Sequence, residues 1–182
     1  MSITTGQGDE GTTRLFSGEE VPKHHPRPVA YGDLDEAVSA MGLARSMATE
    51  SRVKEVLRDL QRRCFVVGSE LATSAEGTER LEERLEEGHL EELDALVEGL
   101  EEQMELPPVF VVPGGCPAAA ALDLARSIVR RLERSTAALA ASEEEGTLSP
   151  HLQPWVNRLS DVLFLLARRE EQHQGVAYDR LK

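Results

Sequence analysis

The chain has 182 residues, of which 40% are hydrophobic but only 4% aromatic, and its formal net charge at pH 7 is −13. This length predicts one domain with a sizeable core, and the abundance of Ala, Leu and Glu favours packed helices over sheets. The negative charge argues against general nucleic-acid binding, and no apolar run is long enough for a membrane span. Two cysteines without metal-type spacing, and no export signal after Met1, predict reduced thiols in a cytoplasmic protein.

The first 32 residues are rich in Gly, Thr and Pro and show no sustained period. We expect an extended arm (1–32) that precedes a helical domain (33–182). Gly permits close approach of the backbone and Thr adds hydroxyl donors, so such an arm suits a polyphosphate, although no GxxxxGK[ST] motif is present. The same composition is equally compatible with a disordered terminus.

Helical periodicity begins at Asp33, and Glu36 completes a capping-box pattern with it. A second helix is predicted over residues 51–72 from apolar residues at three- and four-residue spacing. The segment 76–105 holds thirteen acidic and two basic residues and predicts an acidic helix, interrupted near Gly88, whose charge is most simply solvated.

A short extended apolar connector, PPVFVVPGG (107–115), separates the acidic helix from a helix that begins near Pro117. A last helix is predicted from Pro150 or Gln153 to His173. Five helical segments with little strand signal predict an all-α fold, a five-helix up-down bundle with an N-terminal arm.

The helix after Pro117 has an arginine-rich face. On a helical wheel, Arg126, Arg130 and Arg134 share this face with Asp123 and Glu133. The opposite face is apolar and holds Ala121, Leu124, Ala125, Ile128, Val129 and Leu132. Like charges four residues apart destabilise a helix by about 0.2–0.5 kcal/mol per pair. A bound polyanion would relieve this repulsion, since guanidinium groups suit phosphate oxygens, but an ordinary solvated face is the alternative.

The last helix carries Asn157, Arg158 and Asp161 inside a strongly apolar run. Because buried polar groups need partners, these residues either form hydrogen bonds between helices or face a ligand.

A different enzyme class is also compatible with the sequence. Helical di-iron carboxylate proteins use Glu-x-x-His motifs, and two such motifs occur, at Glu86–His89 and at Glu170–His173. The first lies in a charge run without an inward apolar stripe, and the second lies near the end of the chain, so this interpretation is disfavoured.

Four segments, in order, resemble the PduO-type ATP:cob(I)alamin adenosyltransferases. They are TGQGDEGTTRLFSGEEVPK (5–23), YGDLDE (31–36), FVVPGGCPAAAALDLARSIVRRLER (110–134) and VNRLSDVLFLLAR (156–168). The resemblance implies a homotrimer of five-helix bundles, with ATP and Mg²⁺ bound between neighbouring subunits beneath the arm and the corrinoid against the same site. The implied reaction transfers the 5′-deoxyadenosyl group of ATP to cob(I)alamin and releases triphosphate.

The resemblance also implies roles for individual residues. Arg126, Arg130 and Arg131 match the family's phosphate and salt-bridge arginines. Glu133 and Asn157 match nucleotide or Mg²⁺ contacts, with Glu133 as the metal ligand. The residues that match the ATP-binding arm are Thr5, Gly8, Asp9, Gly11, Thr12, Thr13 and Lys23.

Two further residues are assigned in the same way. Asp35 matches the acid that pairs with Arg126 across the subunit interface. Phe110 matches the aromatic residue that helps to hold the corrinoid without its lower axial ligand, which makes reduction to Co(I) easier.

The chain departs from the family pattern in the arm and in the arginine helix. Gly6 and Glu10 stand where the family usually has lysines, and Asp123 stands where histidine is common. A non-catalytic trimer that senses or delivers the corrinoid or the nucleotide is therefore a second interpretation. A reductase that supplies Co(I) and an adenosylcobalamin-dependent acceptor enzyme are implied partners.

Overall fold

The computed structural model describes residues 4, 6, 8–106, 108–179 and 181. Their elements are, in chain order, β1 (Thr12–Arg14), β2 (Glu20–Pro22), α1 (Pro26–Met47), α2 (Ser51–Leu71), the 3-10 helix η1 (Ala75–Arg80), α3 (Glu87–Glu101), α4 (Pro117–Ala140) and α5 (Leu152–His173). The chain is mostly helical, as predicted. The small antiparallel hairpin of β1 and β2 was not predicted.

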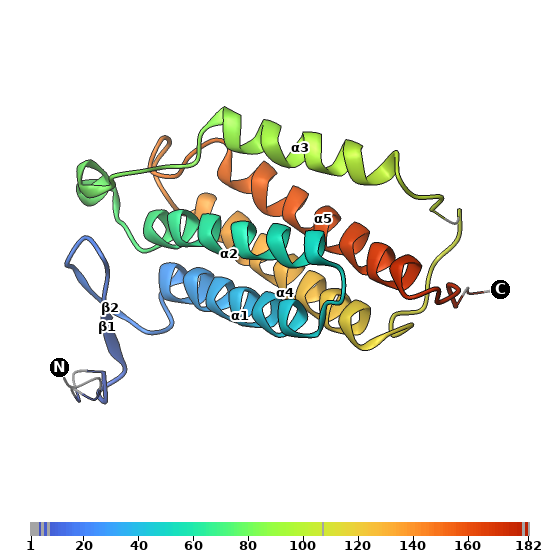
Figure 1. Cartoon of the computed structure of the whole chain (residues 1–182). Helices are drawn as coiled ribbons and strands as arrows, with labels where there is room; N and C mark the ends of the chain where they lie inside the picture. The colour runs from blue at the N-terminus through green and yellow to red at the C-terminus, as the bar shows by residue number, and fades with distance from the viewer. Residues whose placement is uncertain (1–3, 5, 7, 107, 180, 182) are drawn as a thin grey trace.

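The helices lie side by side and share one aliphatic core (Figure 1). α1 packs against α2 and α4, α4 packs against α5, and α3 covers α5. Buried alanines on α1 and α4, such as Ala37, Ala44, Ala118 and Ala125, are almost inaccessible to solvent. Small side chains let two helix backbones approach closely, so the long contact between α1 and α4 follows from the alanine-rich sequence of both.

The start of α1 differs from the expectation. The helix begins at Pro26 rather than Asp33, because Pro suits the first helical turn and the His25 side chain accepts a hydrogen bond from Arg27 N at 3.3 Å. Asp33 is therefore inside the helix, and the predicted capping box of Asp33 and Glu36 was wrong.

The acidic segment is also divided more than expected. It forms η1, an irregular stretch and then α3, which begins at Glu87. Glu86 N donates a hydrogen bond to Nδ1 of His89 at 3.0 Å, so this histidine caps the helix. The predicted bounds of α2, and the predicted starts of α4 and α5, agree closely with the structure.

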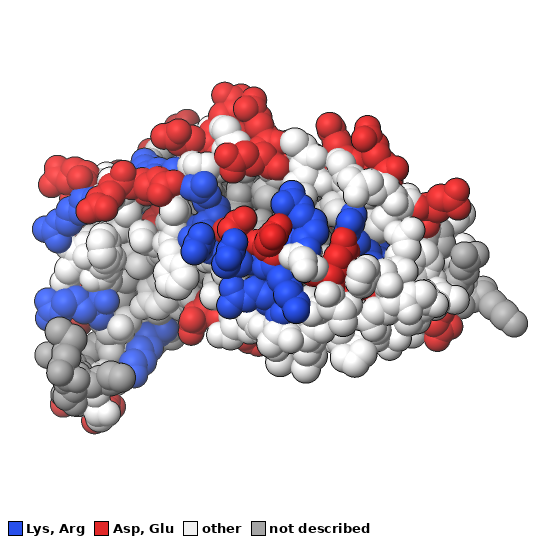
Figure 2. Space-filling view, in the orientation of Figure 1, with Lys and Arg blue, Asp and Glu red and all other residues white. Residues whose placement is uncertain are grey.

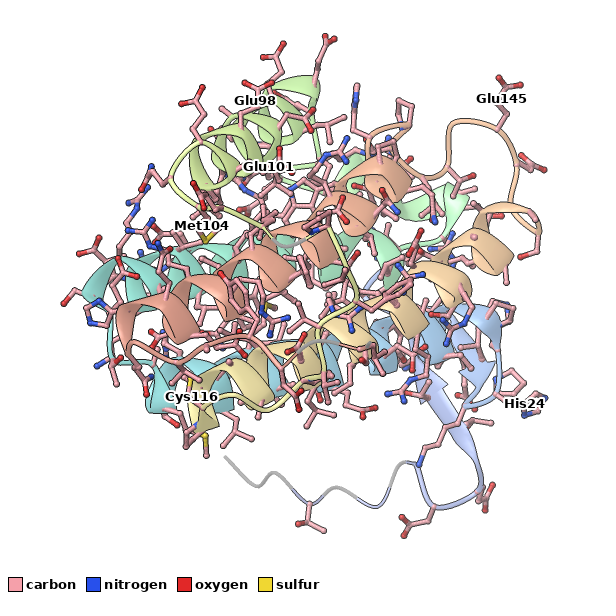
Figure 3. All side chains as sticks on the ribbon, turned by 90° about the vertical axis from the view of Figure 1, so that its right-hand side faces the viewer. His24, Glu98, Glu101, Met104, Cys116 and Glu145 are labelled. Atoms are coloured by element: carbon pink, nitrogen blue, oxygen red, sulfur yellow. The ribbon has the colours of Figure 1, made fainter. Side chains whose placement is uncertain are left out.

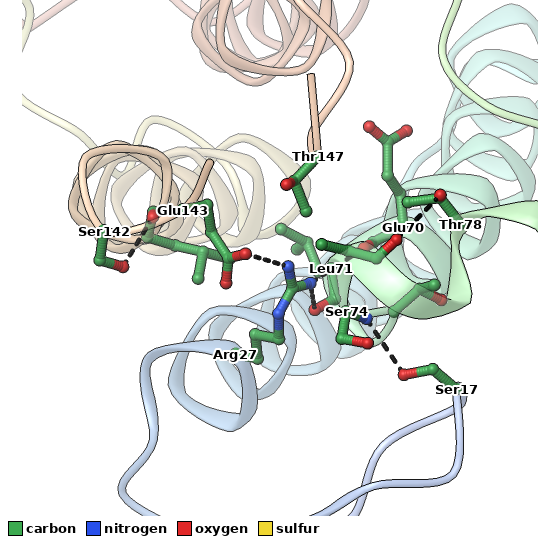
Figure 4. A network of polar contacts seen from close by, with 12 residues as sticks. Ser17, Arg27, Glu70, Leu71, Ser74, Thr78, Ser142, Glu143 and Thr147 are labelled. Carbon is green, nitrogen blue, oxygen red and sulfur yellow. Dashed lines mark hydrogen bonds and ion pairs between the residues drawn. The ribbon is translucent and has the colours of Figure 1, made fainter. Parts of the chain in front are cut away.

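A buried polar network joins the loops at one end of the bundle (Figure 4). The guanidinium of Arg27 lies 2.7 Å from the carboxylate of Glu143 and donates to a main-chain oxygen at the end of α2. The carboxylate of Glu70 accepts hydrogen bonds from the main-chain N–H groups of Leu85 and Ser149. The network therefore fixes the start of α1, the end of α2 and two loops relative to one another.

α5 also borders a groove between α2 and α3. This cavity of about 280 Å³ is lined by Leu60 of α2 and Leu93 of α3, and its floor is Trp155, which is 1% exposed. Acidic side chains gather along α3, whereas both charge signs occur over α2 (Figure 2). Across the described ranges, the helices are too short or too polar to cross a bilayer.

Candidate active site

The arginine face of α4 borders a cavity shared with α5. Arg126 and Arg130 line this cavity of about 220 Å³, called here the arginine cavity, together with Asp161 and Phe164 of α5. Arg126 is partly buried, whereas Arg130 and Arg134 are exposed. Glu101 of α3 also lines the cavity, so two carboxylates accompany the two guanidinium groups, whose donors suit phosphate oxygens.

Glu133, about one helical turn beyond Arg130 on α4, contacts Asn157 of α5. Asn157 Nδ2 donates a hydrogen bond to Oε1 of Glu133 at 2.9 Å, and Asn157 is exposed rather than buried. Arg158 beside it binds Asp94 of α3 and Asp161, and its hydrogen bond to Asp94 raises its pKa. In this run, Arg158 therefore forms a contact between helices, whereas the amide of Asn157 is accessible to solvent.

The wheel misplaced two neighbouring residues of α4. Asp123 was expected on the exposed arginine face but is 4% exposed, and Leu124 was expected on the buried face but is 52% exposed. Asp123 is buried because Arg168 of α5 donates to its Oδ2 at 2.6 Å. A buried carboxylate with such a partner is stable inside the protein, and sequence periodicity cannot show the partner.

Arg131 forms its contacts within the chain. Its Nε lies 3.0 Å from Oδ1 of Asp33, and its Nη2 contacts Glu36. Asp35, which the resemblance pairs with Arg126, is exposed on α1. The contact of Arg131 with a nucleotide stays a prediction.

Phe110 lies on the connector and is 84% exposed. Main-chain hydrogen bonds from Val112 N to Asp179 O, at 2.8 Å, and from Leu181 N to Phe110 O, at 3.1 Å, hold this segment against the C-terminal tail. Val109 and Val112 are exposed beside it, so the connector presents a small apolar surface to solvent.

The predicted arm residues gather around the hairpin. Gly11 has φ +83°, its oxygen accepts a hydrogen bond from Lys23 N at 2.9 Å, and Gly8 lies close beneath the Lys23 side chain. Thr12 and Thr13 belong to β1, and Asp9 is exposed in the turn before it. Thr5 lies outside the described residues.

The tip of the hairpin is attached to the bundle at the end of α2. Phe16 N donates to Ala72 O at 2.9 Å, and Ser74 N donates to Oγ of Ser17 at 3.0 Å. Hydrogen bonds from Ser17 and Ser74 lower the pKa of Glu19 to about 2. We call this contact, between residues 15–19 and 72–80, the hairpin clasp.

The arm and the arginine helix are separated within one chain. The hairpin projects from the bundle ahead of α1 (Figure 1), and His24, next to the hairpin, and Cys116, at the start of α4, lie on opposite sides of the view in Figure 3. Among the described residues, none from the arm lines the arginine cavity. The predicted residues therefore form two groups within one chain, one on the arm and one on α4 and α5. The described residues of the two groups do not meet in the same chain.

Arg168 and Glu171, which the sequence pattern did not indicate, lie behind the arginine cavity, where Arg168 binds Asp123. Both are buried, and burial raises the pKa of the Glu171 carboxyl although Arg168 acts in the other direction. The available signal was a charged residue deep in the apolar run of α5, whose side chain lies over the ring of Phe164 at 5.0 Å.

The Glu-x-x-His motifs have structural roles. His89 caps α3, and the Glu170 carboxylate accepts hydrogen bonds from Thr49 N and Glu50 N at the start of α2, which lower its pKa despite burial. In the described part of the chain, no three His, Cys, Asp or Glu side chains are close enough to hold a metal ion.

Comparison with known proteins identifies the class to which this helical fold and arginine cavity belong. A family model described as "Cobalamin adenosyltransferase" matches residues 3–170, and the chain belongs to this family. A corrinoid adenosyltransferase of Citrobacter freundii is 37% identical over 169 residues, which cover 93% of this chain and 94% of the relative. The corrinoid adenosyltransferase PduO of Salmonella typhimurium is 36% identical over 177 residues, and the chain spans 52% of its length.

A solved structure shows the same fold. A variant PduO-type ATP:corrinoid adenosyltransferase from Lactobacillus reuteri, complexed with cobalamin and ATP, is 29% identical and superposes with a TM-score of 0.89 over 100% of this chain and 99% of that one. The recognition made from the four sequence motifs is confirmed.

Proposed function

We propose that this protein transfers the 5′-deoxyadenosyl group of ATP to cob(I)alamin and so forms adenosylcobalamin and triphosphate. The observation that carries the proposal is the arginine cavity, where two guanidinium groups of α4 meet α5 beside the Glu133–Asn157 pair. The chain belongs to the cobalamin adenosyltransferase family, and an arginine surface of this kind suits the triphosphate released in that reaction.

The reaction needs little acid–base chemistry from the protein. Cobalt of cob(I)alamin attacks the 5′ carbon of ATP, a Co–C bond forms, and the C5′–O bond breaks with its electron pair leaving on triphosphate. Arg126 and Arg130 stabilise the charge that grows on the leaving triphosphate, because fixed cationic donors act where charge develops. The protein also aligns the attack and keeps water from the Co(I) species.

Glu133 and Asn157 would provide oxygen ligands for a magnesium ion carried by ATP. Mg²⁺ commonly takes one or two carboxylates and completes its shell with phosphate oxygens and water. One carboxylate with an adjacent amide, next to two arginines, fits this pattern.

We infer that the complete site forms between copies of the chain in a homotrimer. Among the described residues, none from the arm lines the arginine cavity of its own protomer, so a neighbouring arm would have to reach the cavity. Exposed apolar side chains on α1 and α4, namely Val29, Leu43, Met47 and Leu124, support a covered face there. Asp35 is exposed on α1 and free to meet a partner's arginine, and Phe110 would contact the corrinoid. A cytoplasmic location is part of the proposal and is supported by two unpaired, buried thiols.

The test mixes the protein with ATP, Mg²⁺ and chemically reduced cobalamin and follows the visible spectrum. Formation of the adenosylcobalamin spectrum supports the enzyme, whereas a shifted but unreacted corrinoid spectrum indicates the sensing or delivery protein. Arg130→Ala is the matched variant, because this side chain is exposed and its loss should remove most activity while the helical circular-dichroism signal stays unchanged.

A further inference from the structure

A buried ionic chain runs from the arginine cavity into the interior. Its three inner members, Asp123, Arg168 and Glu171, are 4%, 0% and 1% exposed. Nη2 of Arg168 donates to Oδ2 of Asp123 at 2.6 Å, and Nε of Arg168 lies 2.8 Å from Oε2 of Glu171. At the outer end, Oδ1 of Asp123 lies 3.4 Å from Nε of Arg126.

The inner end of this chain meets the connector at the Gly-Gly turn. The backbone of Gly115 lies against the Glu171 carboxylate. A Cβ on Gly115 would lie 2.6 Å from Oε1 and 3.0 Å from Cδ of Glu171, so any larger residue would displace this buried carboxylate. Gly114 is required for another reason, since its φ is +116°. The turn therefore places the connector directly on Glu171.

Stability alone does not explain three charged residues in the core. Apolar residues of similar volume often stabilise a protein as well as a buried ion pair does, and the best-attested use of such pairs is to fix register. Asp123 lies against both Arg168 and Arg126, so the carboxylate orients the arginine of the cavity. The guanidinium of Arg168 also lies over Phe164, whose ring lines the same cavity.

We propose that Asp123, Arg168 and Glu171 are positioning residues that hold the arginine cavity and the Phe110 connector in fixed register, and so couple the ATP and corrinoid sites. This inference rests on the proposed function, which assigns Arg126 to ATP and Phe110 to the corrinoid. Main-chain pairing with the C-terminal tail stiffens the connector, so a displacement at Gly115 extends to Phe110.

The first test changes the connector and measures the nucleotide. Gly115→Ala should raise the KM for ATP by about two- to thirtyfold, the range found for coupling through side-chain networks, although Gly115 lies outside the arginine cavity. Gly99→Ala on α3 is the matched control, because a Cβ there meets nothing within 4 Å. A KM for ATP within about twofold of wild type, with only the corrinoid KM changed, overturns the proposal.

The second test uses isosteric changes inside the chain. Asp123→Asn and Glu171→Gln keep the shapes of the side chains but remove their charges. If the residues act together, their effects on the KM for ATP are less than additive in the double variant. Independent effects show that each residue acts alone and overturn the proposal.

A third measurement needs no variant and so does not depend on a substituted core folding. In the wild-type protein, ATP alone should slow amide hydrogen exchange at Gly115 and its neighbours in the connector. If the wild-type protein binds ATP and forms adenosylcobalamin but amide exchange in the connector is unchanged by ATP, only this inference is overturned. A wild-type protein that binds ATP but forms no adenosylcobalamin refutes the proposed reaction and leaves the coupling measurable by exchange, whereas one that binds no ATP overturns both.

Discussion

The hairpin clasp depends on a residue without a side chain, and Gly77→Ala tests what the clasp does. A Cβ on Gly77 would lie less than 3.0 Å from Cβ of Ser17, and 3.2 Å from Cγ2 of Thr73. Carbon atoms in van der Waals contact are about 3.5–4.0 Å apart, so the added methyl moves the hairpin by on the order of 1 Å. The φ of Gly77 is not in the left-handed region, and the effect is therefore one of crowding.

The magnitude follows from the contacts at risk. Overpacking of this kind costs about 1–3 kcal/mol. The hairpin can escape that cost by leaving the bundle, which breaks the hydrogen bonds of Ser17 with Ser74 and Arg80, each worth about 1 kcal/mol. If the arm binds ATP, a displaced hairpin raises the KM for ATP by about 5- to 100-fold. The helical core should stay folded.

The assay follows adenosylcobalamin formation at saturating corrinoid and varied ATP, with circular dichroism to monitor folding. Gly99→Ala again serves as the control. A second variant, Ser17→Gly combined with Gly77→Ala, removes the atom that crowds the new methyl and should partly restore the KM. A folded Gly77→Ala protein with the KM of wild type would show that the clasp does not support the nucleotide arm.

Three further outcomes are expected. Arg27→Met should lower the free energy of unfolding in urea by about 3–5 kcal/mol, because it leaves the Glu143 carboxylate without its buried partner; a loss below 1 kcal/mol would contradict this role. Burial raises the pKa of Cys64 to about 12, so iodoacetamide at pH 8 should modify this thiol only after unfolding, and rapid labelling of the native protein would disagree. Because the pKa of Glu19 is lowered to about 2, its hydrogen bonds stabilise the clasp above the ordinary value of 4.5 and are lost as pH falls toward 2; an NMR titration of its carboxyl with a midpoint near 4.5 would refute this.

The helices could be predicted from the sequence because their periodicity is a local property. α2 shows this well, since seven apolar residues follow helical spacing and are buried in the core: Val53, Val56, Leu57, Leu60, Cys64, Val67 and Leu71. The start of α1 could not be predicted in the same way. Asp33 had the pattern of a cap, but Pro26 and His25 offered an earlier start, and the long contact of α1 with α4 supports the additional turns.

The candidate site shows the same division between local and distant information. The arginine face of α4 followed from spacing, but the burial of Asp123 did not, because its partner Arg168 is 45 residues away in the sequence. The pairing of Glu133 with Asn157 also joins two helices, and the sequence left open whether Asn157 served structure or a ligand. The hairpin was missed because its strands have only three residues each, too few to show a period of two.

The position of Trp155 makes the protein convenient to study by fluorescence. It is the single tryptophan of the chain, and its indole lies beneath the groove between α2 and α3, away from the side of α5 that meets α4. Its emission should therefore be blue-shifted in the native state and should move to longer wavelength when the helices separate. Such a signal reports the integrity of the bundle, so a variant with altered catalysis can be distinguished from one that has lost its fold.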